Sequence, residues 1–299
     1  MVVMDPVPLP YFRHPDELPA ALPTRTEIEA ATTTLPTTRH AAYDGRIVVI
    51  GEHFVVKYGQ RVSENEGYAM LYIENHLSSF PAPRLYAMYR AEERLFLVME
   101  LMPGKDLESF WPHLSEDDKV SISQQLRSIW DRMRSLPSPG LYCNMTKGPL
   151  PFRFFLTLDK NPAINGPFTT AKDFALALAL QSKRNWKYNN RKGWISEYFA
   201  RNLPKVLKDN RSTFSHSDIH RKNILINEIS ATGDEERKFV VTAVLDWEAA
   251  GWYPMYWEYA STFVDMGWWD DWAEKLEIIL DSWPSETGML RMVRQDLDY

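Results

Sequence analysis

The sequence predicts an α+β protein of two lobes, with a small strand-rich lobe over residues 1–102 and a larger, mostly helical lobe over residues 103–299. Two observations predict this division. Four short apolar runs bounded by turn residues fall before residue 102, with one helical segment among them. From Ser115 a long segment has apolar residues every three or four positions, the period of a helix packed on a core, and further helical segments follow it.

The small lobe is expected to begin with an extension rich in Pro and Thr, over residues 1–42. In chain order we expect a short helix near 26–31, strands at 46–50 and 53–58, a helix at 64–77, and strands at 84–89 and 95–101. Gly51 fits a tight two-residue turn between the first two strands. A connector over 99–104 then leads into the large lobe.

The large lobe is expected to contain a long helix beginning at Ser115, further helices at 171–182, 194–207 and 271–281, and strands at 223–227 and 239–245. The apolar stripe of the long helix consists of Ile122, Leu126, Ile129 and Met133, and we assign it to the core. Polar, turn-rich residues over 231–236 separate the two strands, which predicts an antiparallel hairpin.

The most informative segment is residues 216–223, His-Ser-Asp-Ile-His-Arg-Lys-Asn. Asn223 begins the first hairpin strand and Asp246 follows the second, so an antiparallel pair would bring them to one edge. Together with Asp218 they form the set needed to hold Mg²⁺-ATP and activate a hydroxyl. Asp, His and Asn in a polar loop can equally be turn and cap residues, but the acid after the return strand favours the catalytic interpretation.

Lys57 closes the apolar run Phe54-Val-Val. A lysine at the end of a buried strand is unusual unless its ammonium has an anionic partner. The alternative is a lysine on an edge strand, in contact with water.

Three segments carry a family resemblance: 216–223 with Leu245-Asp-Trp-Glu248, Leu97-Val-Met-Glu-Leu-Met-Pro-Gly104, and Gly251-Trp-Tyr-Pro-Met-Tyr-Trp-Glu258. They resemble the aminoglycoside phosphotransferase and choline kinase family, and most of all a fungal branch of phosphotransferase-domain proteins. The similarity covers roughly residues 45–265 and implies a protein kinase-like fold. It is specific for the family and says little about the substrate. Ser217 departs from the usual Gly, and Arg221-Lys222 from the frequent Pro-Arg.

The resemblance implies an ATP- or GTP-dependent, Mg²⁺-assisted phosphotransferase acting on a small-molecule hydroxyl. Asp218 would be the catalytic base, and Asn223 and Asp246 would bind the metal. The nucleotide would be bound by Lys57, paired with Glu66, and by the backbone of a connector that runs from Glu100 to Met102. A capping box from Ser63 to Glu66 would instead leave Glu64 to pair with the lysine.

Other polar residues of this region are assigned structural or open roles. His216 and His220 flank an aspartate in a loop, so we expect them to fix that loop rather than bind zinc. Glu248 is expected either to contact a second metal or to brace its loop. The rival functions are a protein kinase, a pseudokinase that binds nucleotide or a partner, and a non-enzymatic binding module.

Composition is that of an ordinary globular protein, with 44% apolar and 25% charged residues. Cys143 is the only cysteine, which excludes an internal disulfide. There is no membrane-length apolar run, no secretory signal and no basic tract typical of nucleic-acid binding. We therefore expect a cytoplasmic protein that binds neither membrane nor nucleic acid and is a monomer or weak dimer.

The C-terminal part is acidic and rich in tryptophan. Residues 246–299 contain twelve Asp and Glu against three Lys and Arg, in a chain of net charge −6. A cleft lined by one sign of charge concentrates ligands of the opposite sign, so a cationic or hydroxyl-rich acceptor is one hypothesis. Its candidate residues are Asp265, Asp270 and Asp271, among tryptophans that otherwise belong to a helical core.

Overall fold

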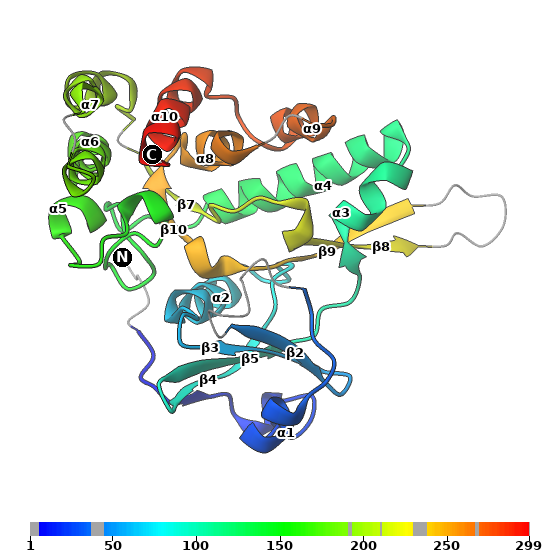
Figure 1. The fold of residues 1–299 in the computed structure, drawn as a ribbon. Helices are drawn as coiled ribbons and strands as arrows, with labels where there is room; N and C mark the ends of the chain where they lie inside the picture. Colours follow the sequence, from blue (N-terminus) through cyan, green and yellow to red (C-terminus); the bar gives the residue numbers. More distant parts are fainter. Residues whose placement is uncertain are drawn as a thin grey trace.

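The computed structural model describes residues 6–36, 45–190, 193–209, 211–229, 238–266 and 269–298. Figure 1 shows two lobes, a small sheet with its flanking helices and a larger, mainly helical part. The predicted α+β class is confirmed. No helix in the described ranges is both long enough and apolar enough to span a bilayer. The division at residues 102 and 103 remains a proposal, although the next strand already pairs within the large lobe.

The small lobe is built on a five-stranded antiparallel sheet of order β1-β4-β5-β3-β2. Its elements are β1 (Tyr11–Phe12), η1 (Pro15–Glu17), α1 (Arg25–Ala30), β2 (Arg46–Ile50), β3 (Phe54–Gly59), α2 (Glu64–His76), β4 (Leu85–Ala91) and β5 (Arg94–Glu100). Side chains alternate between the two faces of β3. Val56 therefore packs under α1, whereas Val55 belongs to the core that contains α2. Lys57 follows Val55 by two positions and shares its face.

The N-terminal extension contacts both edges of this sheet and crosses its outer face. β1 pairs with β4 at one edge, and Thr34 forms an isolated bridge with Val48 at the other. Between these contacts α1 crosses the outer face and buries Ile28 completely. A capping box at Thr24 begins α1, with the Thr24 hydroxyl and the Glu27 carboxylate satisfying each other's backbone N–H. Both edges of the sheet are thus covered by the extension.

The two hairpins of the small lobe have different turns. Ile50 pairs with Phe54, so three residues connect β2 and β3, and the expected two-residue turn is wrong. Gly51 has a φ of 59°, which glycine adopts without steric cost. The β4–β5 turn has two residues, Glu92 and Glu93, both with positive φ. That is the turn geometry that matches the natural twist of a hairpin.

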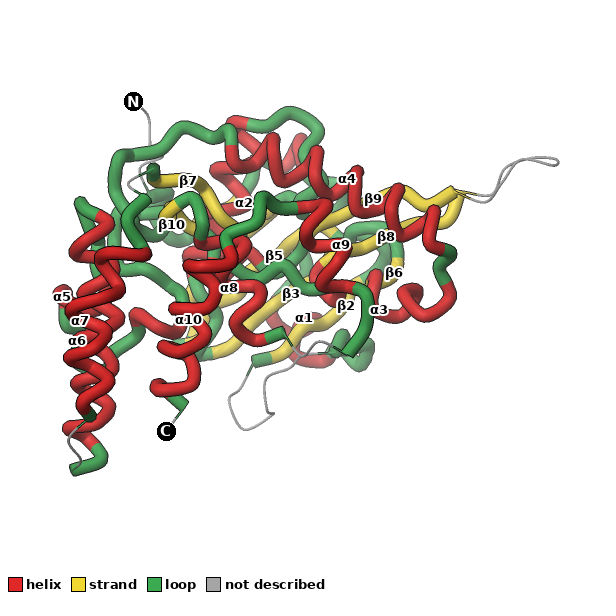
Figure 2. Tube along the Cα trace, turned by 90° about the horizontal axis from the view of Figure 1, so that it is seen from above, coloured by secondary structure: helices red, strands yellow, loops and turns green. Residues whose placement is uncertain are grey.

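The large lobe follows the connector. Its elements are β6 (Lys105–Asp106), α3 (Leu107–Phe110), η3 (Trp111–His113), α4 (Glu116–Arg134), η4 (Arg153–Phe155), α5 (Pro162–Asn165), α6 (Ala171–Tyr188), α7 (Trp194–Val206), β7 (Ser212–Ser215), η5 (Arg221–Asn223), β8 (Ile224–Ile229), β9 (Lys238–Val244), η6 (Trp247–Ala249), β10 (Gly251–Pro254), α8 (Trp257–Asp265), α9 (Trp272–Ile279) and α10 (Pro284–Leu297). Figure 2 shows α6 and α7 as a long hairpin at one side. The turn-rich residues expected at 231–236 lie outside the described residues.

Two small antiparallel sheets position the segments that carry Asp218, Asn223 and Asp246. β6, β8 and β9 form one sheet, and β7 pairs with β10 in the other. The β8–β9 pair is the hairpin expected from the sequence. The β7–β10 pair and the helices α8 and α10 were not expected from the sequence.

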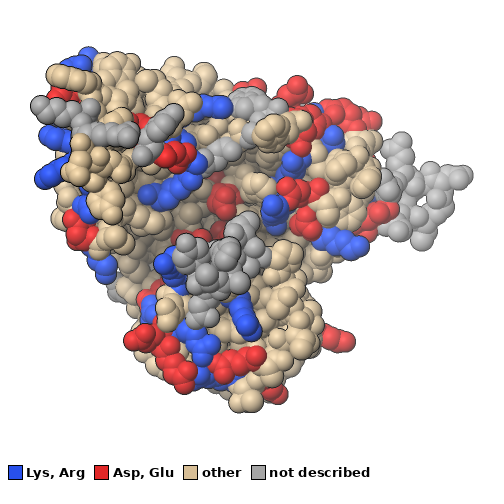
Figure 3. Space-filling model, viewed as in Figure 1, with Lys and Arg blue, Asp and Glu red and all other residues tan. Residues whose placement is uncertain are grey.

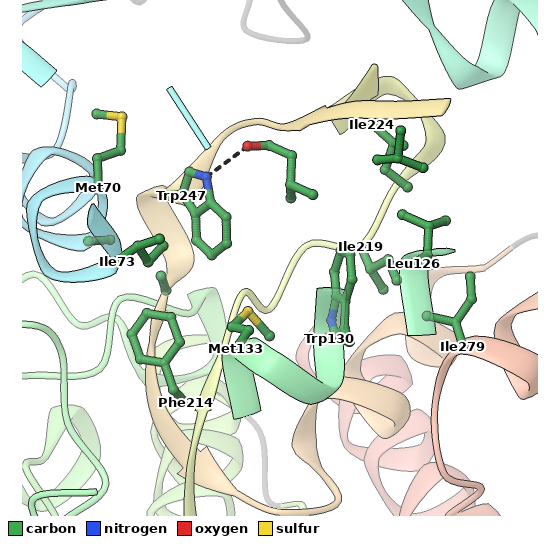
Figure 4. Packing of buried hydrophobic residues seen from close by; sticks show 14 of the residues in the cluster. Met70, Ile73, Leu126, Trp130, Met133, Phe214, Ile219, Ile224, Trp247 and Ile279 are labelled. Atoms are coloured by element: carbon green, nitrogen blue, oxygen red, sulfur yellow. Dashed lines mark hydrogen bonds between the residues drawn. The ribbon is translucent and has the colours of Figure 1, made fainter. Parts of the chain in front are cut away.

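The core of the large lobe supports the loop between β7 and β8. Ser115 caps α4 through a capping box with Asp118, and the helix buries Ile122, Leu126 and Met133 as expected. Figure 4 shows Ile219, in the middle of the loop, beside Leu126 and Trp130 of α4. A single apolar side chain thus anchors a loop that is otherwise polar.

Candidate active site

Lys57 of β3 and Glu66 of α2 form a buried ion pair, with Lys57 Nζ 2.7 Å from Glu66 Oε2. Glu64 instead pairs with Arg90 at 2.8 Å. The Ser63 hydroxyl accepts the N–H of Asn65, so the alternative arrangement, a capping box with Glu66, does not form. Of the two glutamates, Glu66 is therefore the one that meets the lysine.

Two further carboxylates reach the same ammonium. Lys57 Nζ lies 2.7 Å from Asp246 Oδ1 and 3.3 Å from Glu248 Oε2. Burial lowers the pKa of Lys57, but the three carboxylates outweigh burial and raise that pKa well above its usual value. Burial raises the pKa of Glu66 to about 7; Lys57 opposes this shift, and Asp246 and Glu248 add to it. The cluster therefore carries more negative than positive charge.

The loop from β7 to β8 places Asp218 and Asn223 beside this cluster. Asn223 donates from Nδ2 to Asp218 Oδ2 at 2.9 Å and to the Asp218 carbonyl oxygen at 3.1 Å. The N–H of Leu245 donates to the carbonyl oxygen of Asn223 at 2.7 Å, so Asp246 follows directly beside Asn223. Burial raises the pKa of Asp218, as does Asp246, while His216 and the Asn223 hydrogen bond oppose the rise.

The histidines of this loop have structural contacts. His216 Nδ1 accepts the Asp218 N–H at 3.2 Å, which leaves Nε2 to donate to the Leu245 carbonyl oxygen at 2.9 Å. His220 accepts the Lys222 N–H. His216 thus ties the loop to the segment that carries Asp246, as expected from the sequence.

Two residues of the site adopt left-handed backbone conformations: Ser217 with φ 68° and Asp246 with φ 65°. Such values are uncommon for residues other than glycine and cost free energy that the surroundings must offset. At Ser217 the N–H group donates to both carboxylate oxygens of the fully buried Glu258, each at 3.2 Å. Glu258 therefore fixes the loop at the position where the family usually has glycine.

Asn65 is a positioning residue that the sequence reasoning missed. Its Nδ2 donates to the carbonyl oxygens of Glu248 at 3.0 Å and Ala250 at 2.8 Å, and its Oδ1 accepts the Met145 N–H at 3.0 Å. One buried amide therefore joins α2 of the small lobe to two segments of the large lobe. The available signal was a polar residue next to Glu66, just before the apolar run 68–73 of the same helix.

The connector offers fewer free backbone groups than expected. The N–H of Glu100 donates to Arg84 and that of Leu101 to His53, both at 2.9 Å. Within the described residues the Met102 N–H has no partner, so it is the remaining donor of this segment. The side chains of Glu100 and Met102 line a cavity of about 540 Å³ that none of the site's charged residues lines.

Two of the three acids proposed for an acceptor pocket form ion pairs within the protein. Asp270 lies 2.7 Å from Arg221, and Asp271 lies 2.7 Å from Lys119. The Arg221 guanidinium also lies 5.2 Å from the ring centroid of Trp111. The side chain of Asp265 and all of Trp268 lie outside the described residues. Of the other tryptophans in this part, Trp247, Trp252, Trp257 and Trp272 are buried, Trp283 is half-buried, and Trp269 is exposed.

Figure 3 shows a hollow between the two lobes with acidic side chains on its floor. A lysine for phosphate, a loop carboxylate, and oxygen ligands on two neighbouring segments are the parts that phosphoryl transfer requires.

Comparisons with known proteins agree with this arrangement. The model of the phosphotransferase enzyme family (APH) matches residues 46–287. The fold is similar to a thermostable mutant of aminoglycoside phosphotransferase APH(4)-Ia solved with ADP and hygromycin B, at 16% identity, TM-score 0.57, and coverage of 91% of this chain and 87% of that one. It is also similar to APH(2")-IIa solved with streptomycin and ATP, at 14% identity, TM-score 0.53, and coverage of 88% and 82%. No curated protein matches significantly.

The structural likenesses establish the kinase-like fold, and the family match covers more than half of the chain. The narrower resemblance to a fungal branch remains a prediction. The chain belongs to the phosphotransferase enzyme family and is a small-molecule kinase of the aminoglycoside phosphotransferase-like type.

Proposed function

We propose that this protein transfers the γ-phosphoryl group of ATP, with Mg²⁺, to a hydroxyl group of a small molecule. The observation that carries the proposal is the convergence of Lys57, Asp246 and the Asp218–Asn223 pair from three separate segments. Family membership supports the reaction class, and the ADP, AMP-PNP and ATP bound to the similar structures support a nucleotide donor.

The residues present fit a magnesium ion. One ligand oxygen from each of Glu66, Asp246 and Glu248 lies within 4.8 Å of the others. The Asn223 amide turns its nitrogen toward Asp218, so among the described residues its Oδ1 is left without a donor. Carboxylate and amide oxygens are the ligands that Mg²⁺ prefers. Asp246 and Asn223 would hold the ion, which would neutralise phosphate charge.

Lys57 would contact the α and β phosphates, with Glu66 holding its ammonium in place. In this structure Lys57 also contacts Asp246 and Glu248. When a metal and phosphates bind, Lys57 would replace its contacts with Asp246 and Glu248 by contacts with phosphate oxygens, which are also negatively charged. Burial of Glu66 keeps its carboxylate on Lys57 through that exchange.

Asp218 would accept the proton of the acceptor hydroxyl. Its side chain is accessible to solvent, and Ile219, His216 and Glu258 fix the loop that carries it. Its raised pKa makes the carboxylate a better base, provided that the reaction runs above that pKa.

Adenine would be bound through the Met102 N–H and a carbonyl oxygen of the connector. GTP is kept as an alternative donor, and the assay includes it. A cationic acceptor would need residues other than Asp270 and Asp271, because both are neutralised by Arg221 and Lys119. The acceptor is therefore proposed only as a small hydroxyl compound.

The test is label transfer from γ-labelled ATP or GTP to pooled metabolites, with Mg²⁺ or with chelator, followed by identification of the labelled product. A general protein substrate is assayed in parallel. We expect a labelled small molecule from wild type and none from Asp218→Asn. Transfer to protein alone, or nucleotide binding without transfer to any pool, would overturn the proposal in favour of a protein kinase or a pseudokinase.

A further inference from the structure

The hairpin of α6 and α7 concentrates positive charge in an acidic protein. Residues 183–211 contain nine Lys and Arg and only two Asp and Glu, in a chain of net charge −6. Arg184 pairs with Asp159 and Arg211 with Asp209. Five cations are exposed and have no ion-pair partner among the described residues: Lys183, Lys187, Arg201, Lys205 and Lys208. The net charges of the whole chain and of residues 246–299 do not reveal this concentration of positive charge.

Large aromatic side chains stand at the connecting end of the same hairpin. Tyr188 ends α6 and is 87% exposed, and Trp194 begins α7 and is 78% exposed. Figure 2 shows that this end of the hairpin protrudes from the rest of the molecule. Tyr198 is also exposed, one helical turn after Trp194.

The outward face of α7 continues this pattern. Trp194, Tyr198, Arg201 and Lys205 are spaced at i, i+4, i+7 and i+11, which places them along one face of a helix. The opposite face buries Phe199 and Leu203 in the core. The exposed face is therefore not needed to hold the helix in the fold.

We propose that the outer surface of the α6–α7 hairpin binds peripherally to anionic phospholipid membranes. Lys and Arg are attracted by the negative surface of such membranes, and Trp and Tyr prefer the level of the lipid headgroups. Aromatic side chains at a protruding end, with cations set back along both helices, match a shallow insertion. The proposal revises the expectation that the protein does not bind membranes, but only with respect to binding at the membrane surface.

Nucleic acid and a second copy of this chain fit this surface less well. Proteins that bind single-stranded nucleic acid place aromatic side chains in a positively charged groove, whereas these lie at a protruding end. Two copies meeting through this face would bring like charges together. In Figures 2 and 3 the hairpin projects on the side where the hollow between the lobes opens, so a docked protein would turn that hollow toward the membrane.

The experiment is co-sedimentation of the full chain, without nucleotide, with vesicles of pure phosphatidylcholine or of phosphatidylcholine with phosphatidylserine. We expect binding only to the serine-containing vesicles, weakened by high salt. Lys183→Glu combined with Lys187→Glu should lower the partition coefficient by roughly tenfold or more, and Trp194→Ala by about threefold to tenfold.

The matched control is Trp269→Ala, which removes a tryptophan that is 92% exposed but lies outside the hairpin. It should bind vesicles as wild type does, and thermal melting should show all variants folded. The proposal fails if wild type ignores phosphatidylserine, if the hairpin variants bind as wild type, or if Trp269→Ala loses binding equally. Binding of an RNA oligonucleotide without binding of vesicles would also overturn it. These readouts do not depend on phosphoryl transfer.

Discussion

Two acidic regions of this molecule differ in how their charges are balanced. Around Lys57, three carboxylates share one ammonium, and one of them, on Glu66, has its pKa raised by burial. Near the C-terminus, Asp270 and Asp271 each have a cation of their own. Burial raises the pKa of Asp271, but the hydrogen bonds of Lys119 and Trp111 outweigh it and lower that pKa.

This difference in charge balance distinguishes a ligand-binding site, around Lys57, from a region whose acids only stabilise the fold, near the C-terminus. Surplus carboxylates held together at partial burial are unfavourable unless a cation joins them, so their presence indicates a ligand. Acids that are matched one to one are satisfied without a ligand. Sequence charge alone does not make this distinction, because it counts residues and not partners.

The largest expected effect is on turnover. Asp218→Asn should reduce kcat by about 10²- to 10⁴-fold, because the amide cannot accept the proton of the acceptor. Nucleotide affinity should change little, since Lys57 and Asp246 are retained. The measurement is steady-state kinetics with the acceptor found by label transfer, with Asp270→Asn as the matched change in the balanced region. Near-normal turnover by Asp218→Asn would remove Asp218 from the catalytic role.

The second effect is on metal-dependent nucleotide binding. A ligand at about 100 times its Kd stabilises a protein by about 2.7 kcal/mol. Asp246→Ala should abolish the Mg²⁺-dependent part of that stabilisation, and Asn223→Ala should weaken it less, because an amide is the poorer ligand for a hard cation. The measurement is thermal shift with ATP, with and without Mg²⁺. Equal Mg²⁺ dependence in wild type and Asp246→Ala would place the metal elsewhere.

The third effect is on pH-dependent stability without metal and nucleotide. The pKa of Glu66 rises from 4.5 to about 7 on folding, so between these values the native state holds more protons than the unfolded state. Stability should therefore fall as pH rises through this window, and Glu66→Gln should remove that part of the slope. The measurement is thermal melting across the window in chelator, with Glu64→Gln as control. An unchanged slope in Glu66→Gln would show that another group titrates.

Much of the fold and part of the site could be predicted from the sequence because they rest on local patterns. The α4 stripe, the β8–β9 hairpin and the spacing from Asp218 to Asn223 are visible in the chain itself. Asn65 and Glu258 act through backbone groups far away in sequence, at residues 248–250 and 217, and no spacing rule connects them. The partners of Asp270 and Asp271 were missed for the same reason, since Arg221 and Lys119 come from other elements.

The fourth effect tests the scaffold in the balanced region. The Arg221 guanidinium lies 5.2 Å from the ring centroid of Trp111 and 5.7 Å from that of Trp272, and it pairs with Asp270. Arg221→Gln should lower the free energy of unfolding by about 1–2 kcal/mol, because it removes both a partly desolvated cation–π contact and an ion pair. Denaturant melting measures this loss. If Arg221→Gln is as stable as wild type, the contacts of Arg221 with the two tryptophans and Asp270 do not stabilise the loop between β7 and β8.

The smallest effect is expected for Asp270→Asn. If Asp270 were part of an acceptor pocket for cations, this change would raise the KM of a cationic acceptor several-fold and make the KM less sensitive to salt. Because its carboxylate is paired with Arg221, we expect instead an unchanged KM and a loss of less than about 1 kcal/mol in stability, as for other partly exposed ion pairs. Kinetics with amines, aminoglycosides and neutral polyols at low and high salt decide between the two. A KM that rises only for cationic acceptors would return Asp270 to the acceptor site and show that charge balance does not separate site from scaffold.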